Sequence, residues 1–127
     1  MQGLTSHPYA HPDDFLKVRD LLIRTYTITA PGVNWEVRRW DGKNFHNDKL
    51  SWNPAWERTR RLWETEGGDL VGVVNPEGTG DFYVQIHPDY RALENEMIAW
   101  AESALAVGDP PVLETFAFDH DSARNRV

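Results

Sequence analysis

The sequence contains no cysteine among its 127 residues. A disulfide framework, a cysteine-based zinc site and a thiol nucleophile are therefore excluded. Long hydrophobic runs are also missing, because no stretch approaches the ~20 apolar residues that a membrane-spanning helix needs. The opening residues, Met1-Gln2-Gly3-Leu4, lead into a polar, proline-rich segment that does not resemble a signal peptide. We therefore expect a cytoplasmic protein that has no membrane partner.

Basic residues are in the minority, with 13 Lys and Arg against 20 Asp and Glu, which gives a formal net charge of −7 at pH 7. The basic residues are interleaved with acids, as in Glu57-Arg58-Thr59-Arg60-Arg61. A sequence-independent grip on nucleic acid requires clustered Lys and Arg. We therefore expect no nucleic-acid partner.

Aromatic residues, by contrast, are abundant. They make up 12% of the chain and include six tryptophans, in a length that suits one domain around one core. Buried aromatic rings usually supply core packing, so a large aromatic core is expected. The alternative is an exposed aromatic surface that binds a substrate or another domain.

Hydrophobic periodicity predicts a mixed order of helices and strands. Apolar residues at helical spacing, with Asp13 and Asp14 at the start, indicate a first helix. The expected elements are a short strand over 4–10 interrupted by Pro8, helices over 13–27 and 33–46, a loop over 47–56, strands over 59–65, 70–74 and 81–86, a helix over 92–106 and a final strand over 112–118.

The three central strands should form an antiparallel meander. Gly67 and Gly68 lie in a turn that would join the first two strands as a hairpin. The third strand alternates, which predicts Phe82, Val84 and Ile86 on one face and Tyr83, Gln85 and His87 on the other. Because the final strand follows a strand and a helix, we expect it to lie parallel to the third meander strand by a right-handed crossover.

This order, with Asp69-Leu70-Val71-Gly72-Val73 and then Asp81 to Arg91, resembles the cofactor-binding region of the GNAT superfamily of N-acetyltransferases. The resemblance covers nearly the whole chain. It implies an α+β fold, a mixed three-layer αβα arrangement of the GNAT or acyl-CoA N-acyltransferase type, truncated after the fifth family strand. Residues 1–127 would form one such domain.

The resemblance also implies a cofactor and its site. In that family the pantetheine arm of acetyl-CoA enters between two parallel strands that separate, which assigns its contacts here to the strand at Val84 and Ile86. The pyrophosphate binds at the following helix start, which assigns Arg91, Ala92, Leu93 and Glu94. Unpaired N–H groups and the dipole make a helix start favourable for anions.

The implied reaction is direct transfer of an acetyl group from acetyl-CoA to an amine of a small molecule or protein. A base removes a proton from the amine, which then attacks the thioester. Gln85 and His87 share a strand face from which a base would act, and histidine has a suitable unperturbed pKa. The alternative for His87 is a solvent-facing residue before a proline. A small ligand-binding αβ domain unrelated to acyl transfer is a further alternative.

Two glutamates depart from the family pattern at the helix start. Glu94 and Glu96 stand where the family keeps small residues. A carboxylate ~5 Å from a phosphate charge costs roughly 3 kcal/mol at an effective dielectric near 20, or about a hundredfold in affinity. As acids of the first helical turn they would instead stabilise the helix. This favours an alternative function, a non-catalytic GNAT-like domain that packs on and supports a second, active acetyltransferase domain.

The end of the chain is the second departure, because family members continue with a further helix and closing strands. The expectation is the N-terminal part of a longer or tandem-domain protein. A second GNAT domain or another subunit would then cover the open edge of the sheet.

No metal site is predicted. His7 and His11 have the spacing of two ligands on one helical face, but Pro8 and Pro12 oppose a helix there. His120 stands between two acids, Asp119 and Asp121, in a stretch after a strand where polar turn residues are expected.

Overall fold

The computed structural model describes residues 3–10, 13–29, 33–45, 56–76, 80–106 and 113–115. The elements follow the order β1 (Leu4–Pro8), α1 (Asp13–Thr25), α2 (Val37–Phe45), α3 (Trp56–Thr59), β2 (Arg61–Thr65), β3 (Leu70–Asn75), β4 (Tyr83–Ile86), the 3-10 helix η1 (Pro88–Leu93) and α4 (Glu94–Leu105). The fold is therefore a mixed α+β fold, as expected. Within the described ranges, no helix is long and apolar enough to cross a membrane.

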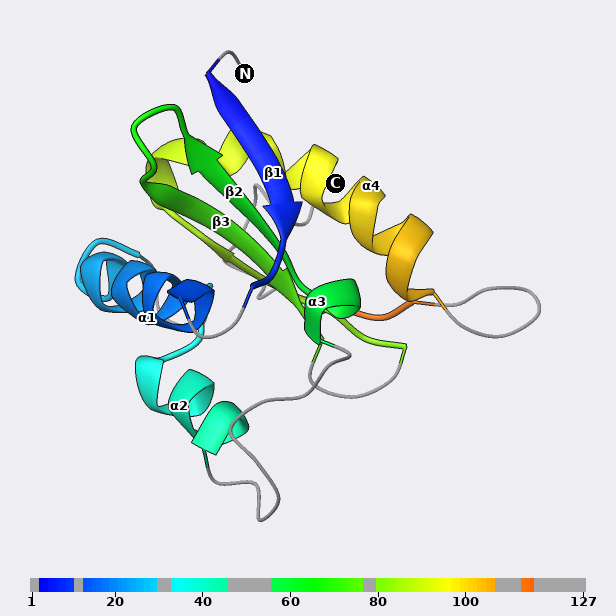
Figure 1. The fold of residues 1–127 in the computed structure, drawn as a ribbon, viewed down its shortest axis with the longest axis horizontal. Coiled ribbons are helices and arrows are strands. Elements are labelled where there is room, and N and C mark those ends of the chain that lie inside the picture. Colours follow the sequence, from blue (N-terminus) through cyan, green and yellow to red (C-terminus); the bar gives the residue numbers. More distant parts are fainter. Residues whose placement is uncertain are drawn as a thin grey trace.

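The strands form one antiparallel sheet in the order β1-β2-β3-β4 (Figure 1). The predicted hairpin between β2 and β3 is confirmed. Its turn places Gly68 at φ 87°, a left-handed conformation that favours glycine, and the Gly68 N–H donates to the Thr65 carbonyl at 3.0 Å. Pro8 ends β1, which is an outer strand, where a missing N–H is tolerated.

One face of the sheet carries α1, and α2 packs beside α1. In Figure 1, α1 and α4 lie on opposite sides of the sheet. The α1 side encloses an aromatic core that includes Trp35 and Trp40. Phe15, Val18, Leu21 and Leu22 recur at helical spacing and turn the apolar side of α1 into that core.

The opposite face is covered by α4. Met97, Ala101 and Leu105 of α4 are buried in a second core with strand residues of the sheet. Trp63 belongs to this second core and meets Trp100 edge to face, with ring centroids 6.3 Å apart. The expected aromatic core therefore exists as two layers, one on each side of the sheet.

The alternation predicted for β4 is confirmed. Phe82, Val84 and Ile86 belong to the core under α4, whereas Tyr83 packs against the core under α1. Gln85 is opposite Val73 in the register and therefore shares the α1 side.

Several predicted boundaries were wrong. The strand predicted over 59–65 is preceded by the short helix α3, because Trp56–Thr59 turns helically and β2 begins only at Arg61. The helix predicted over 92–106 is α4, which begins at Glu94. The 3-10 helix η1 before it, where Pro88 fixes a helical φ, was not predicted. The helix predicted over 33–46 begins at Val37. Most of the predicted loop over 47–56 lies outside the described residues, but Trp56 belongs to α3.

The predicted final strand over 112–118 is described only at 113–115. There, Glu114 forms an isolated parallel bridge with Asp81. The Phe82 N–H donates to the Glu114 carbonyl at 2.9 Å, and the Glu114 N–H donates to the Gly80 carbonyl at 3.0 Å. The predicted parallel direction is therefore present at the one bridge that is described.

Candidate functional site

The outer edge of β4 is the place to which the resemblance to the GNAT pattern assigns a cofactor. The His87 N–H donates to the Val71 carbonyl at 2.9 Å, and Gln85 pairs with Val73 in the same antiparallel register. Because antiparallel strands alternate hydrogen-bonded and non-bonded pairs, the N–H and C=O of Ile86 point away from β3. These are backbone groups that an added strand or an extended ligand would bind.

Asn34 occupies both of those groups. Its side-chain nitrogen donates to the Ile86 carbonyl at 2.8 Å, and its side-chain oxygen accepts the Ile86 N–H at 2.8 Å. The same nitrogen donates to the Thr25 hydroxyl at 3.1 Å, which ties the contact to the end of α1. The edge of the sheet at Ile86 is thus capped from within the chain.

Gln85 is a buried structural residue. Its side-chain oxygen accepts the backbone N–H of Trp35 at 2.6 Å, and its side-chain nitrogen donates to the Asn75 side-chain oxygen at 3.2 Å. All of the side chain is buried. The amide connects β3, β4 and the segment before α2, and this connection leaves it remote from solvent and from any acceptor amine that would arrive from solvent.

His87 ends β4 and begins η1. Its Nδ1 accepts the Asp89 N–H at 3.1 Å, which makes it the N-cap of the 3-10 helix, and its ring meets Tyr90 edge to face at 5.6 Å. The N-cap contact uses the lone pair of Nδ1, so the free proton on a neutral ring is at Nε2. His87 therefore has a structural task at the helix start.

The helix start differs from the glycine-rich anion site of the family pattern. The helical path begins at Pro88, and the Glu94 N–H is already bonded to the Arg91 carbonyl. Arg91 Nε lies 2.8 Å from Glu94 Oε1, so the arginine of η1 faces a carboxylate at the start of α4. Glu94 and Leu93 are buried, whereas Ala92 is exposed.

Glu96 has a partner as well, because its carboxylate accepts the indole N–H of Trp63. Glu94 and Glu96 both lie in the first turn of α4, where acids complement the helix dipole. Both glutamates that interrupt the family pattern thus make contacts within the chain, Glu94 with Arg91 and Glu96 with Trp63.

A cavity of about 520 Å³ lies at the beginning of β4, next to the parallel bridge. Its lining residues are Asp81, Tyr83, Leu113, Glu114 and Thr115. The Tyr83 ring also contacts Trp35 at 5.2 Å between centroids, and the Arg39 guanidinium lies over both rings. The parallel segment and β4 are therefore neighbours at this point, upstream of Pro88.

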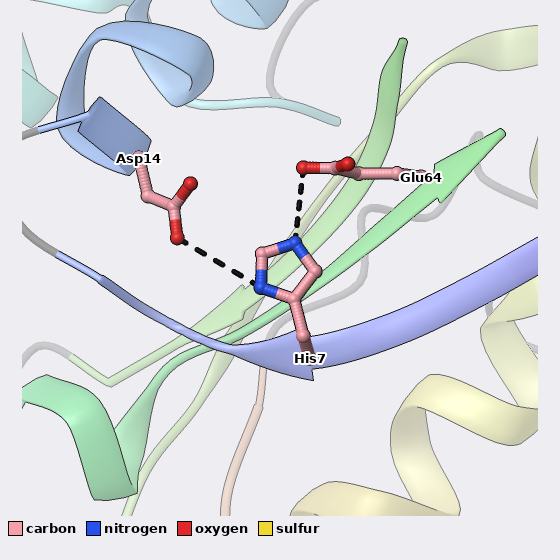
Figure 2. A group of neighbouring side chains, drawn as sticks. All are labelled: His7, Asp14 and Glu64. Carbon is pink, nitrogen blue, oxygen red and sulfur yellow. Dashed lines mark hydrogen bonds and ion pairs between the residues drawn. The ribbon is translucent and has the colours of Figure 1, made fainter. Parts of the chain in front are cut away.

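A second polar cluster joins β1, α1 and β2 on the α1 side of the sheet (Figure 2). His7 Nε2 lies 3.0 Å from Glu64 Oε1, and His7 Nδ1 lies 3.8 Å from Asp14 Oδ2. Lys17 Nζ is 3.0 Å from Glu64 Oε1. Asp14 Oδ2 also accepts the Ala10 N–H at 2.7 Å.

The charges of the cluster shift its pKa values. Partial burial would lower the pKa of His7, but the hydrogen bonds to Glu64 and to the Pro8 carbonyl raise that pKa overall. Partial burial would raise the pKa of Glu64, but its hydrogen bonds to His7 and Lys17 lower that pKa overall. The hydrogen bond to Glu64 also raises the pKa of Lys17.

The cluster also has the residue types of a metal site. Oxygen or nitrogen atoms of His7, Asp14 and Glu64 lie within 4.8 Å of one another. A cation there would have to compete with the Lys17 ammonium for Glu64, so Lys17 already supplies positive charge to the cluster.

Sequence reasoning missed this cluster because His7 and Glu64 are 57 residues apart. Spacing in the sequence suggested only His11 as a partner for His7, and His11 lies outside the described residues. Asp119, His120 and Asp121 also lie outside them. The capping role of Asn34 was missed for the same reason, since Asn34 and Ile86 are separated by 52 residues.

Comparison with known proteins found no match, either among protein-family models or among curated proteins.

Proposed function

We propose that this chain is a non-catalytic domain with a GNAT-like arrangement, which packs on and supports a second, active acetyltransferase domain. The order of elements supports the arrangement: an antiparallel sheet, a helix over one face, and a segment that returns parallel to β4. The non-catalytic character is inferred from the sites to which acetyl-CoA would be assigned, because this chain uses those sites for its own contacts.

The observation that carries the proposal is the contact between Asn34 and Ile86. A pantetheine arm bonded to this edge would have to replace the two hydrogen bonds of the Asn34 amide. At about 1 kcal/mol net for each bond, displacement costs roughly 2 kcal/mol, or about thirtyfold in affinity. The electrostatic cost of the helix-start glutamates lowers the affinity for acetyl-CoA by a further factor of roughly a hundred. The two effects together should lower that affinity by about three orders of magnitude.

The candidate catalytic side chains support the same conclusion. Gln85 is enclosed between Trp35 and Asn75, and His87 caps η1. A general base must reach the proton that it abstracts, and a fully buried amide has neither that access nor a basic nitrogen.

The supporting role requires a surface for the second domain. Leu16 and Ile23 are seven residues apart and thus lie on one side of α1, where they are 60% and 50% exposed. Tyr26 and Ile28 follow the helix at 70% and 54% exposure. We propose this apolar row, Leu16, Ile23, Tyr26 and Ile28, as the surface that meets the active domain.

Calorimetric titration with acetyl-CoA tests the missing cofactor site. The native chain should give no binding heat up to millimolar acetyl-CoA. Asn34→Ala should also give no binding heat, because the glutamates are still present. Asn95→Ala, a change of an exposed asparagine on α4, is the matched control. Micromolar binding by the native chain would overturn the proposal.

A second candidate function, N-acetyl transfer to an amine by this chain itself, is favoured by the parallel bridge beside β4. It requires Asn34 to leave Ile86 when acetyl-CoA binds. The double variant Glu94→Gln and Glu96→Gln would then raise acetyl-CoA affinity by up to about a hundredfold. If that double variant still gave no binding heat with acetyl-CoA, this second candidate function would be excluded.

The association is tested through the apolar row on α1. A photo-crosslinking amino acid at Ile23 should join the chain to a polypeptide that turns over acetyl-CoA, and the same probe at exposed Glu102 on α4 should not. Equal labelling at both positions, or a partner without acetyl-CoA turnover, would contradict the assigned surface.

A further inference from the structure

The ring of His7 faces oxygen atoms on both sides. Nε2 lies 3.0 Å from Glu64 Oε1, and Nδ1 lies 2.8 Å from the carbonyl oxygen of Pro8. The Asp14 carboxylate approaches Nδ1 as well, at 3.8 Å. Figure 2 shows the two carboxylates on different sides of the imidazole.

These contacts favour a proton on both ring nitrogens. A carbonyl and a carboxylate only accept hydrogen bonds, so each ring nitrogen must carry a proton to satisfy its neighbour. A neutral imidazole has one N–H and satisfies one of them. His87 provides the contrast within the same chain, because its Nδ1 accepts the Asp89 N–H and is therefore unprotonated.

We propose that His7 is an imidazolium that locks the edge strand β1 onto α1 and β2, and that loss of its proton releases β1. The lock joins three elements through one ring, since Glu64 belongs to β2, Asp14 belongs to α1 and His7 belongs to β1.

The charges that face the ring support the doubly protonated state. Among the described residues, the titratable groups around His7 are Glu64 from β2 and Asp14 and Lys17 from α1. Protonated His7 and Lys17 balance the two carboxylates. A neutral His7 leaves two negative charges beside one ammonium in a partly buried setting, which is unfavourable. The raised pKa of His7 agrees with this balance.

The strand that would be released is an outer strand of the sheet, paired along one side only. β1 has five residues, pairs only with β2 and ends at Pro8, which has no N–H to donate. Local opening of a protein begins in elements with few partners. Release of β1 would expose the edge of β2, and an exposed strand edge is a surface for pairing with another chain.

The direction of the pH effect follows from linkage. The pKa of His7 is higher in the folded state than its ordinary value of 6.5. The stabilisation is therefore complete below about 6.5 and is lost as the pH rises through the raised pKa. The lock holds β1 in mildly acidic solution and opens on the alkaline side.

Nitrogen-resolved NMR of the histidine rings tests the first half of the proposal. In the native chain, both ring nitrogens of His7 should be largely protonated at pH 6, and the midpoint at which the ring loses one proton should lie above pH 6.5. A singly protonated His7 ring at pH 6 would overturn the proposal. This measurement uses the unaltered protein and therefore does not depend on how a variant folds.

Amide hydrogen exchange of β1 from pH 5.5 to 9 tests the second half, with β3 amides as the internal reference for the intrinsic pH dependence. The opening constant of β1 should rise severalfold across this range in the native chain and should be insensitive to pH in His7→Gln. Lys17→Gln is the matched control, because Lys17 contacts the same Glu64 oxygen but keeps its charge throughout the range.

The control should raise the opening constant by about two- to fivefold at every pH, as expected for a partly exposed ion pair. The native pH dependence should remain in Lys17→Gln. A pH-independent opening constant in the native chain, or a dependence that survives in His7→Gln, would show that His7 is not the lock.

Discussion

The guanidinium of Arg60 lies over the indole ring of Trp40, with its carbon 4.5 Å from the ring centroid. It also lies 5.0 Å from the ring centre of Tyr9. All three side chains are buried. Burial lowers the pKa of Arg60 to about 10 and raises the pKa of Tyr9, so the arginine is still a cation at neutral pH, between two aromatic faces.

Arg60→Lys should therefore destabilise the protein although the charge is conserved. A planar guanidinium stacks on a ring, and a more strongly hydrated ammonium does so less well when buried. We expect a loss of about 1–2 kcal/mol in the free energy of unfolding, measured by urea denaturation. Arg58→Lys, at an exposed position of α3, is the control and should change stability by less than about 0.5 kcal/mol.

Asn34→Ala should destabilise the edge of β4. The Ile86 N–H and C=O would lose both partners, and a buried backbone group without a partner costs about 1–3 kcal/mol. Urea denaturation should show a loss in that range, whereas Asn95→Ala should be nearly neutral. Equal stability of the two variants would mean that water replaces the Asn34 amide at no cost.

Gly72→Ala tests the close contact between β3 and α4. A Cβ at Gly72 would lie 2.9 Å from Met97 Cε, which forces the methionine side chain to move. Such overpacking costs about 1–3 kcal/mol, at the lower end here because methionine is flexible. Gly67→Ala is the matched control, since its Cβ would meet nothing nearer than Thr65 Oγ1 at 3.8 Å.

A second substitution distinguishes overpacking from a loss of backbone freedom at Gly72. Met97→Val removes the clashing atoms, so the double variant should lose less stability than the sum of the losses in Gly72→Ala and Met97→Val alone. Additive losses in the double variant would argue that the Cβ of residue 72 does not meet Met97.

The loss of folding stability at low pH should depend on Glu64. Its pKa is lower in the folded state than its ordinary value of 4.5, so the stabilisation is present above about 4.5 and is lost as the pH falls through the folded pKa. Glu64→Gln should flatten the loss of stability between pH 5 and pH 3, measured as the urea midpoint. An unchanged acidic slope would show that other carboxylates control acid unfolding.

Local patterns predicted much of the architecture. The alternation of Phe82 to His87 gave the two faces of β4, and Gly67-Gly68 gave the hairpin turn, because side-chain direction in a strand and the conformation of a tight turn depend on neighbouring residues. The boundaries at Arg61 and Pro88 were missed, since short helices such as α3 and η1 carry little periodic signal.

The cofactor site stays a prediction, and its contacts could not be predicted from the sequence. The resemblance to the GNAT pattern assigned Val84, Ile86, Arg91 and Glu94 to that site, but no spacing indicates that Glu94 faces Arg91 in a buried position. Gln85 illustrates the limit: alternation indicates its face, whereas its partners Trp35 and Asn75 come from other parts of the chain.

Sequence alone determined most of the described helical and extended segments, which sides of them are apolar, and that no cysteine side chain takes part in any chemistry of these 127 residues. Only the tertiary structure decided that Asn34 caps Ile86 and that His7 stands between Asp14 and Glu64. The physical reason is distance along the chain: periodicity acts over a few residues, whereas these polar partners meet only after the sheet has brought remote segments together.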